Sequence, residues 1–197
     1  MMKLFNRWDI SEVNVSDPGL VNFVNLKPIL VPKTSGRNVK VKFWKNKKPI
    51  VERLMNHLMI PGHKGKKHKT TSRHCTGKGI TAYNIIIKTF DILEKKTNKN
   101  PVEVFVKALE NASPREEITS IEYGGARYAQ AVDCSPQRRI DLALRMMIQG
   151  AYANSFGKKM AIEVALSNEI LLAYNVDQKS NAISKKLELE RQADSSR

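Results

Sequence analysis

Residues 116–139, EEITSIEYGGARYAQAVDCSPQRR, interrupt a chain that otherwise has the pattern of a helical protein. Polar and apolar side chains alternate on both sides of Gly124-Gly125, and glycine takes the positive φ that tight hairpin turns require. Ser135-Pro136 then matches a helix N-cap followed by proline at the first helical position. The stretch predicts a two-stranded hairpin over about residues 117–133. Because an isolated hairpin is marginally stable in water, it should pack on helices or project as an arm stabilised by a partner.

Helical periodicity flanks the hairpin on both sides. It predicts helices over residues 50–59, 81–97, from 100 onward, 136–154, 160–173 and 179–193. The cleanest apolar stripe is in residues 136–154, whereas residues 160–173 are apolar nearly all round and should form the central buried helix. The fold class is therefore mainly α. We expect a single helical domain of about six helices, residues 49–197, with one protruding two-stranded hairpin.

Residues 1–48 read as an irregular, basic N-terminal extension laid over that domain. Turn signals such as Asp17-Pro18-Gly19 separate short apolar patches, which could include one or two short strands. Residues 37–48, RNVKVKFWKNKK, form either a short basic strand or an ordered loop. Phe43-Trp44 could stack on bases, but anchoring in the core is favoured because buried aromatic rings outnumber ligand platforms.

The excess positive charge lies in less than half of the chain. Residues 18–90 contain 16 of the 34 Lys and Arg but only one of the 19 acids, Glu52, which gives this segment a net charge of +15. The remainder is neutral. Such polarity indicates a polyanionic partner, most simply the phosphates of nucleic acid; the alternative is a solvated basic face that aids solubility.

Residues 63–79, HKGKKHKTTSRHCTGKG, have no acid and no large aliphatic side chain, so they cannot build a core. Their lysines and hydroxyl groups match a phosphate-binding loop that is ordered by its ligand. A linker without fixed structure is the alternative reading.

Several other classes of protein are disfavoured by the sequence. Two cysteines, Cys75 and Cys134, provide no secreted disulfide framework. The first twelve residues include acids and no long apolar run, which argues against a signal peptide. No segment approaches the ~18 consecutive apolar residues of a membrane span. A cytoplasmic protein with reduced cysteines, without membrane contact, is expected.

Catalytic and metal chemistry is also disfavoured. His63, His68, His74 and Cys75 are close in sequence, but adjacent His74 and Cys75 do not have the spacing of zinc ligands and the neighbouring lysines would repel a cation. No nucleophile elbow or phosphate-binding glycine loop occurs, and carboxylates are scattered over the helices. We expect no enzyme activity, cofactor or metal site.

Two motifs carry a family resemblance: residues 111–121, NASPREEITSI, and residues 130–139, QAVDCSPQRR. With PIVERLMN at 49–56, Gly150-Ala151 and KKLELER at 185–191, they strongly resemble the small-subunit ribosomal protein family numbered seven in the universal set. The resemblance is to the archaeal and eukaryotic branch more than to the bacterial one. It covers about three quarters of the chain, and the motifs of residues 1–48 match more weakly.

The resemblance implies a helical protein that binds small-subunit rRNA directly and nucleates assembly of the subunit head. It further implies a place near the decoding region, where the hairpin approaches the exit-site tRNA, with mRNA nearby, and a neighbouring ribosomal protein. With the lysines of residues 37–48, the positions expected to bind rRNA are Lys40, Lys42, Lys45, Lys47, Lys48, Arg53, Lys64, Lys66, Lys67, Lys69, Arg73, Lys78, Arg138 and Arg139. The positions expected near tRNA or a protein neighbour are Tyr123, Gly124, Gly125, Arg127 and Tyr128.

The hairpin departs from a phosphate-binding pattern because Arg127 is its only basic residue, among Glu116, Glu117, Glu122 and Asp133. It should therefore act by shape or through protein contacts. Two rival functions stay open at this point. One is a DNA-binding protein that places helix 136–154 in a groove through Arg138, Arg145 and Gln149, and the other is a nucleic-acid-modifying enzyme.

Overall fold

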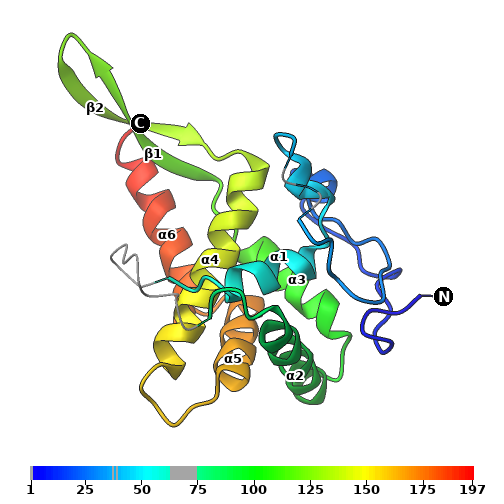
Figure 1. The fold of residues 1–197 in the computed structure, drawn as a ribbon. Coiled ribbons are helices and arrows are strands. Elements are labelled where there is room, and N and C mark those ends of the chain that lie inside the picture. Colours follow the sequence, from blue (N-terminus) through cyan, green and yellow to red (C-terminus); the bar gives the residue numbers. More distant parts are fainter. Residues whose placement is uncertain (1, 37, 39, 63–74) are drawn as a thin grey trace.

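The computed structural model describes residues 2–36, 38, 40–62 and 75–197. Within these ranges it is mainly helical with one antiparallel hairpin, which confirms the predicted fold class (Figure 1). The elements are the 3₁₀ helices η1 (Val21–Phe23) and η3 (Trp44–Lys47), the helices α1 (Ile50–Leu58), α2 (Gly79–Thr97), α3 (Pro101–Ala112), α4 (Pro136–Ser155), α5 (Ile162–Tyr174) and α6 (Asn181–Asp194), and the strands β1 (Glu116–Tyr123) and β2 (Ala126–Asp133).

Local signals explain why several helices begin where they do. The Asn100 side chain accepts a hydrogen bond from the backbone N–H of Val102 at 3.0 Å, with Pro101 in the first turn of α3. Ser180 caps α6 in the same way through the N–H of Ile183. Because such caps depend on neighbouring residues, the predicted helix ends lie within two residues of the observed ones.

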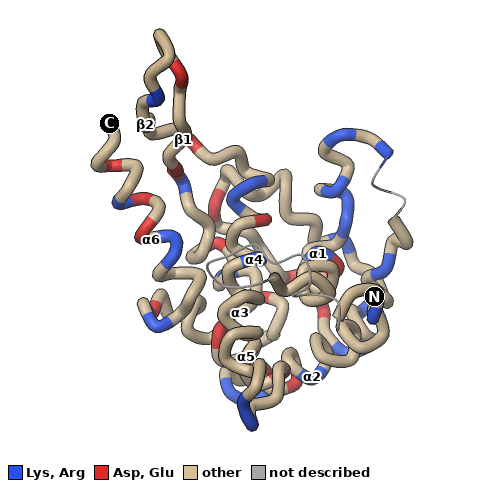
Figure 2. The backbone as a smooth tube through the Cα atoms, turned by 60° about the vertical axis from the view of Figure 1, so that its left-hand side comes forward, with Lys and Arg blue, Asp and Glu red and all other residues tan. Residues whose placement is uncertain are grey.

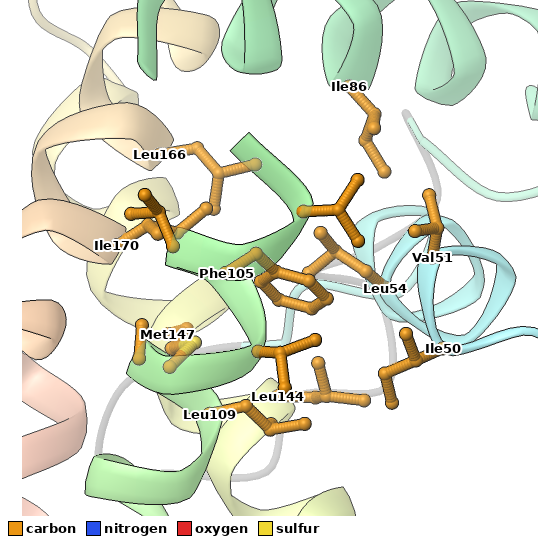
Figure 3. Packing of buried hydrophobic residues seen from close by; sticks show 14 of the residues in the cluster. Ile50, Val51, Leu54, Ile86, Phe105, Leu109, Leu144, Met147, Leu166 and Ile170 are labelled. Carbon is orange, nitrogen blue, oxygen red and sulfur yellow. The ribbon is translucent and has the colours of Figure 1, made fainter. Parts of the chain in front are cut away.

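The core is centred on α3. Val102, Phe105 and Leu109 have no measurable exposure, and Figure 3 shows Phe105 between Leu54 of α1 and other apolar side chains of the cluster. Helix α5, predicted over residues 160–173 as the central buried helix, does pack against α2, α3, α4 and α6, but it is not buried all round, because Val164 is 37% exposed.

The N-terminal extension contributes to the same core. Leu4, Trp8 and Leu20 are almost completely buried. The indole of Trp8 meets the ring of Phe90 from α2 edge-on, with centroids 5.6 Å apart, and its N–H donates to Glu94. In the described part of the extension, isolated bridges such as Asn25 with Pro49 occur in place of the possible short strands. The extension is irregular in backbone but integral in packing.

The hairpin packs at its base and projects at its tip. Its register pairs Glu116 with Asp133 and Tyr123 with Ala126, and Gly124 and Gly125 both have positive φ, at 59° and 80°, as the sequence predicted. At the base, the backbone N–H of Arg115 donates to Glu190 of α6 at 3.0 Å. Figure 1 shows the tip extending beyond the helices, and residues 119–130 are all exposed.

Candidate nucleic-acid interface

The described residues of the lysine segment, which we define as residues 40–48, carry five lysines and no acid. Lys40, Lys42 and Lys47 are exposed, while Lys45 and Lys48 are half-buried. Glu52, the only acid between residues 18 and 90, is buried in α1 and accepts a hydrogen bond from the Thr34 hydroxyl at 2.7 Å. Figure 2 shows Lys and Arg along the chain that precedes α1. The segment therefore presents positive charge and has no acid of its own to neutralise it.

Asp141 of α4 fixes the lysine segment to the helical domain. Its carboxylate pairs with Lys45, with the Nη2 of Arg53 at 2.9 Å and with the Nε2 of His57 at 3.9 Å. Burial favours the neutral acid, but hydrogen bonds from His57, Lys45 and Arg53 outweigh it and hold the pKa of Asp141 far below its usual range. The ionised Asp141 thus joins three elements: η3, α1 and α4.

Two arginines predicted to bind rRNA are buried in ion pairs. The Arg53 side chain is 4% exposed and also donates to the carbonyl of Phe23 at 3.3 Å. Arg139 pairs with Asp17 at 2.6 Å and donates to the carbonyl of Pro114 at 3.1 Å. Their partners lie 88 and 122 residues away in sequence, so no local pattern could reveal them. Both arginines tie the extension to the domain through these buried contacts.

The other predicted arginine and lysine positions are either exposed or outside the described residues. Arg138 is exposed at the base of the hairpin and donates to the Glu117 carboxylate at 2.6 Å, which raises the pKa of Arg138. Lys78 is exposed at the N-terminal end of α2. The remaining predicted positions, Lys64, Lys66, Lys67, Lys69 and Arg73, lie outside the described residues.

The prediction that Phe43 and Trp44 anchor the core was wrong. The two residues are 62% and 38% exposed, respectively. Lys42 lies over the Phe43 ring with its Nζ 5.2 Å from the centroid, and Lys47 lies over the Trp44 ring at 4.2 Å. Other residues of the extension, such as Leu20 and Val24, join the buried apolar cluster instead. Cations and exposed aromatic rings therefore share one short segment.

The hairpin tip has a different chemistry. Tyr123 and Tyr128 are 81% and 59% exposed, and Tyr128 faces Ile121 across the strands. Arg127 pairs with Glu122 at 3.6 Å, so the one basic residue of the hairpin is next to a carboxylate. Gly124 and Gly125 form the turn between these residues. The tip offers aromatic and apolar surface, with no excess of positive charge.

The rival readings find no support in the part of the chain that the structure describes. In α4, residues 137–151 are buried or half-buried except for Arg138 and Arg145, and Arg138 is paired with Glu117. Among the described residues, no three or more His, Cys, Asp and Glu side chains are grouped to hold a metal ion. Burial and the nearby charge of Glu117 raise the pKa of the Cys134 thiol to about 11, which disfavours a reactive thiolate.

None of the described helices has the length and apolar character needed to cross a bilayer. The fold and the interface together define a mainly helical protein that displays cations at its surface.

The comparisons with known proteins agree with this class. The family described as "Ribosomal protein S7p/S5e" matches residues 27–197. The "Small ribosomal subunit protein uS7" of Nanoarchaeum equitans is 60% identical over 196 residues, covering 100% of this chain and 99% of the relative. The protein of the same name from Methanothermobacter thermautotrophicus is 47% identical over 191 residues, covering 97% of both chains. The chain therefore belongs to the ribosomal protein S7p/S5e family.

Proposed function

We propose that this protein is a structural constituent of the small ribosomal subunit that binds rRNA directly and nucleates assembly of the subunit head. Family membership and the two full-length relatives, both named as small-subunit proteins, support the ribosomal role. The observation that carries direct RNA binding is the lysine segment, in which exposed lysines occur without a single acid and are fixed to the domain by Asp141.

The proposed rRNA-binding surface consists of the exposed lysines of this segment, Lys40, Lys42 and Lys47, together with Lys48 and Lys78. Lysine and arginine contacts to phosphates release condensed counterions, which supplies affinity without reading sequence. Folded rRNA would then be recognised mainly by its shape, because side chains cannot read the deep groove of an A-form helix. Lys64, Lys66, Lys67, Lys69 and Arg73 remain part of the proposal on the strength of the sequence alone.

For the hairpin we infer a position near the decoding region, where its tip approaches the exit-site tRNA, mRNA or a neighbouring ribosomal protein. Support comes from its projection beyond the helices and from the exposure of Tyr123 and Tyr128. With Arg127 paired to Glu122, such contacts would depend on shape and on aromatic surface more than on charge.

A filter-binding titration tests direct rRNA binding. The full chain is titrated with a transcript of the small-subunit rRNA head and, separately, with duplex DNA of equal charge at the same salt concentration. We expect tighter binding to the rRNA transcript. Equal or tighter binding to duplex DNA would contradict the proposal. An order-of-addition reconstitution then tests nucleation, since omitting the protein should prevent other head proteins from joining the rRNA.

A further inference from the structure

Phe43 and Trp44 are the two aromatic residues of the lysine segment, and both are exposed. The backbone conformation indicates that this exposure has a purpose. Phe43 has a left-handed backbone conformation, with φ at 67°. This conformation is uncommon for a residue with a side chain and costs conformational energy. A bulky ring in this conformation that also remains 62% exposed gains little from its own packing, so folding alone does not explain it.

The backbone below the two rings is held by several contacts. The Nδ2 of Asn25 donates to the carbonyl of Lys47, the N–H of Trp44 donates to the carbonyl of Val41 at 3.2 Å, and Lys45 pairs with Asp141. Lys45 thus points to the domain from the 3₁₀ helix that carries Trp44. The aromatic pair is presented on an anchored turn and not on a free strand.

The lysines beside the rings favour one kind of ligand. Lys42 and Lys47 lie over the two rings, which is the geometry of a cation–π contact, and each ammonium group keeps donors for an anion. A nucleotide combines a flat π surface with a phosphate a few ångströms away. Sites for unpaired nucleic acid combine aromatic rings for the bases with a positive groove for the backbone. The absence of acids from the lysine segment suits an anionic ligand and disfavours a basic protein partner.

We propose that Phe43 and Trp44 form a stacking site for an unpaired base of RNA, with Lys42 and Lys47 contacting the phosphates on either side of it. The base must be unpaired, because a base inside a duplex has both faces covered by its neighbours. This inference rests on the proposed rRNA-binding function and adds to it a single-stranded contact beside the recognition of folded rRNA.

The two tryptophans of the chain allow a direct optical test. Trp8 is 5% exposed and Trp44 is 38% exposed, so a ligand that stacks on Trp44 quenches only the exposed part of the emission. The full chain is titrated at low salt with a single-stranded uridine decamer and with duplex RNA of equal charge. We expect saturable quenching by the decamer and little by the duplex. In Trp44→Leu the remaining emission comes from Trp8, and the quenching should disappear.

Affinity measurements with the rRNA head transcript separate stacking from charge. Replacing either ring, in Phe43→Leu or Trp44→Leu, should weaken binding on the order of tenfold while the slope of log K against log salt stays unchanged. Replacing Lys42 and Lys47 by Gln should lower that slope by about 0.7 to 0.9 for each phosphate that the variant no longer binds. The matched control is Phe156→Leu, which removes a ring of similar exposure, 66% against 62% for Phe43, at the C-terminal end of α4 and should leave rRNA affinity unchanged.

Each outcome bears on a different claim. Suppose that the wild-type chain prefers rRNA but both ring variants bind it as tightly as wild type. The stacking site is then wrong, and rRNA binding stands. In that case, capture of a neighbouring ribosomal protein by the wild-type chain, but not by the ring variants, would assign Phe43 and Trp44 to a protein contact. Circular dichroism verifies that each variant is folded. If the wild-type chain shows no preference for rRNA, the proposed function itself fails.

Discussion

The N-terminal extension and the hairpin both lie apart from the helices α1–α6, and they combine regularity and burial in opposite ways. The extension has an irregular backbone, yet Leu4, Trp8 and Leu20 are buried in the common core. The hairpin has a regular ladder and a tight turn, yet residues 119–130 are all exposed. Regular hydrogen bonding is therefore no measure of what holds this fold together.

The two regions also differ in net charge. Residues 18–90 carry the whole positive excess, whereas the hairpin is acidic. The extension, which presents cations, is fixed to the helical domain through Lys45 with Asp141 and Asp17 with Arg139. A rigid mount limits the entropy lost when flexible lysines meet phosphates. We therefore propose that the extension binds the anionic partner, while the hairpin projects from the domain.

The largest expected effect is loss of a core ring from the extension. Trp8→Ala should reduce the free energy of unfolding by about 4 kcal/mol, since it removes a buried ring and leaves a cavity beside Phe90. Urea denaturation monitored by circular dichroism measures the change. The control, Trp44→Ala in the same extension, should cost less than about 1 kcal/mol because its ring is exposed. Similar losses in both variants would remove the distinction between the anchored and the displayed parts of the extension.

The next effect concerns the clamp between the extension and the helices. Asp141→Asn leaves Arg53 buried without its anionic partner and should reduce the free energy of unfolding by about 3 kcal/mol. Asp91→Asn is the matched control, since it breaks the exposed Arg7–Asp91 pair and should cost less than about 1 kcal/mol. Both values come from urea denaturation at neutral pH. If the two variants lost equal stability, Asp141 would not be the point that holds the extension.

A smaller effect is the acid sensitivity of the same clamp. Because the pKa of Asp141 is lower in the folded chain than in the unfolded chain, its contribution is fully present above the usual Asp pKa of about 3.9. The contribution is lost as the pH falls from there toward the folded value. Unfolding free energies measured from pH 6 to pH 2 should fall less steeply in Asp141→Asn than in the wild-type chain. Parallel curves would show that Asp141 does not carry this linkage.

The smallest effect is expected from shortening the hairpin. Removing the paired residues Ile121 with Tyr128 and Glu122 with Arg127 keeps the register and the Gly-Gly turn. All four are exposed, so the free energy of unfolding should change by less than about 0.5 kcal/mol. Thermal and urea melts of the free chain measure it. A loss above about 2 kcal/mol would mean that the tip belongs to the folding core, as the extension does.

The sequence predicted those features that depend on neighbouring residues. Asn100-Pro101 located the start of α3, and Gly124-Gly125 located the hairpin turn, because caps and turns depend on a few adjacent residues. The burial of Arg53 and the exposure of Trp44 could not be predicted from the sequence, since both follow from long-range packing of the extension. The lysine segment was visible in the charge pattern, but Asp141, its anchor, resembled any other acid on a helix.

The most direct test of the division between the binding extension and the projecting hairpin is the salt dependence of rRNA binding in two variants. The first variant replaces Lys40, Lys42 and Lys47 by Gln, and the second is the shortened hairpin. A third variant, in which the exposed Lys158, Lys159 and Lys179 are replaced by Gln, controls for the change in net charge. The account predicts that the slope of log K against log salt falls by up to about 2.7 in the first variant, at about 0.9 for each phosphate bound, and stays at the wild-type value in the other two. A lowered slope in the shortened hairpin, with a wild-type slope in the lysine variant, would contradict it.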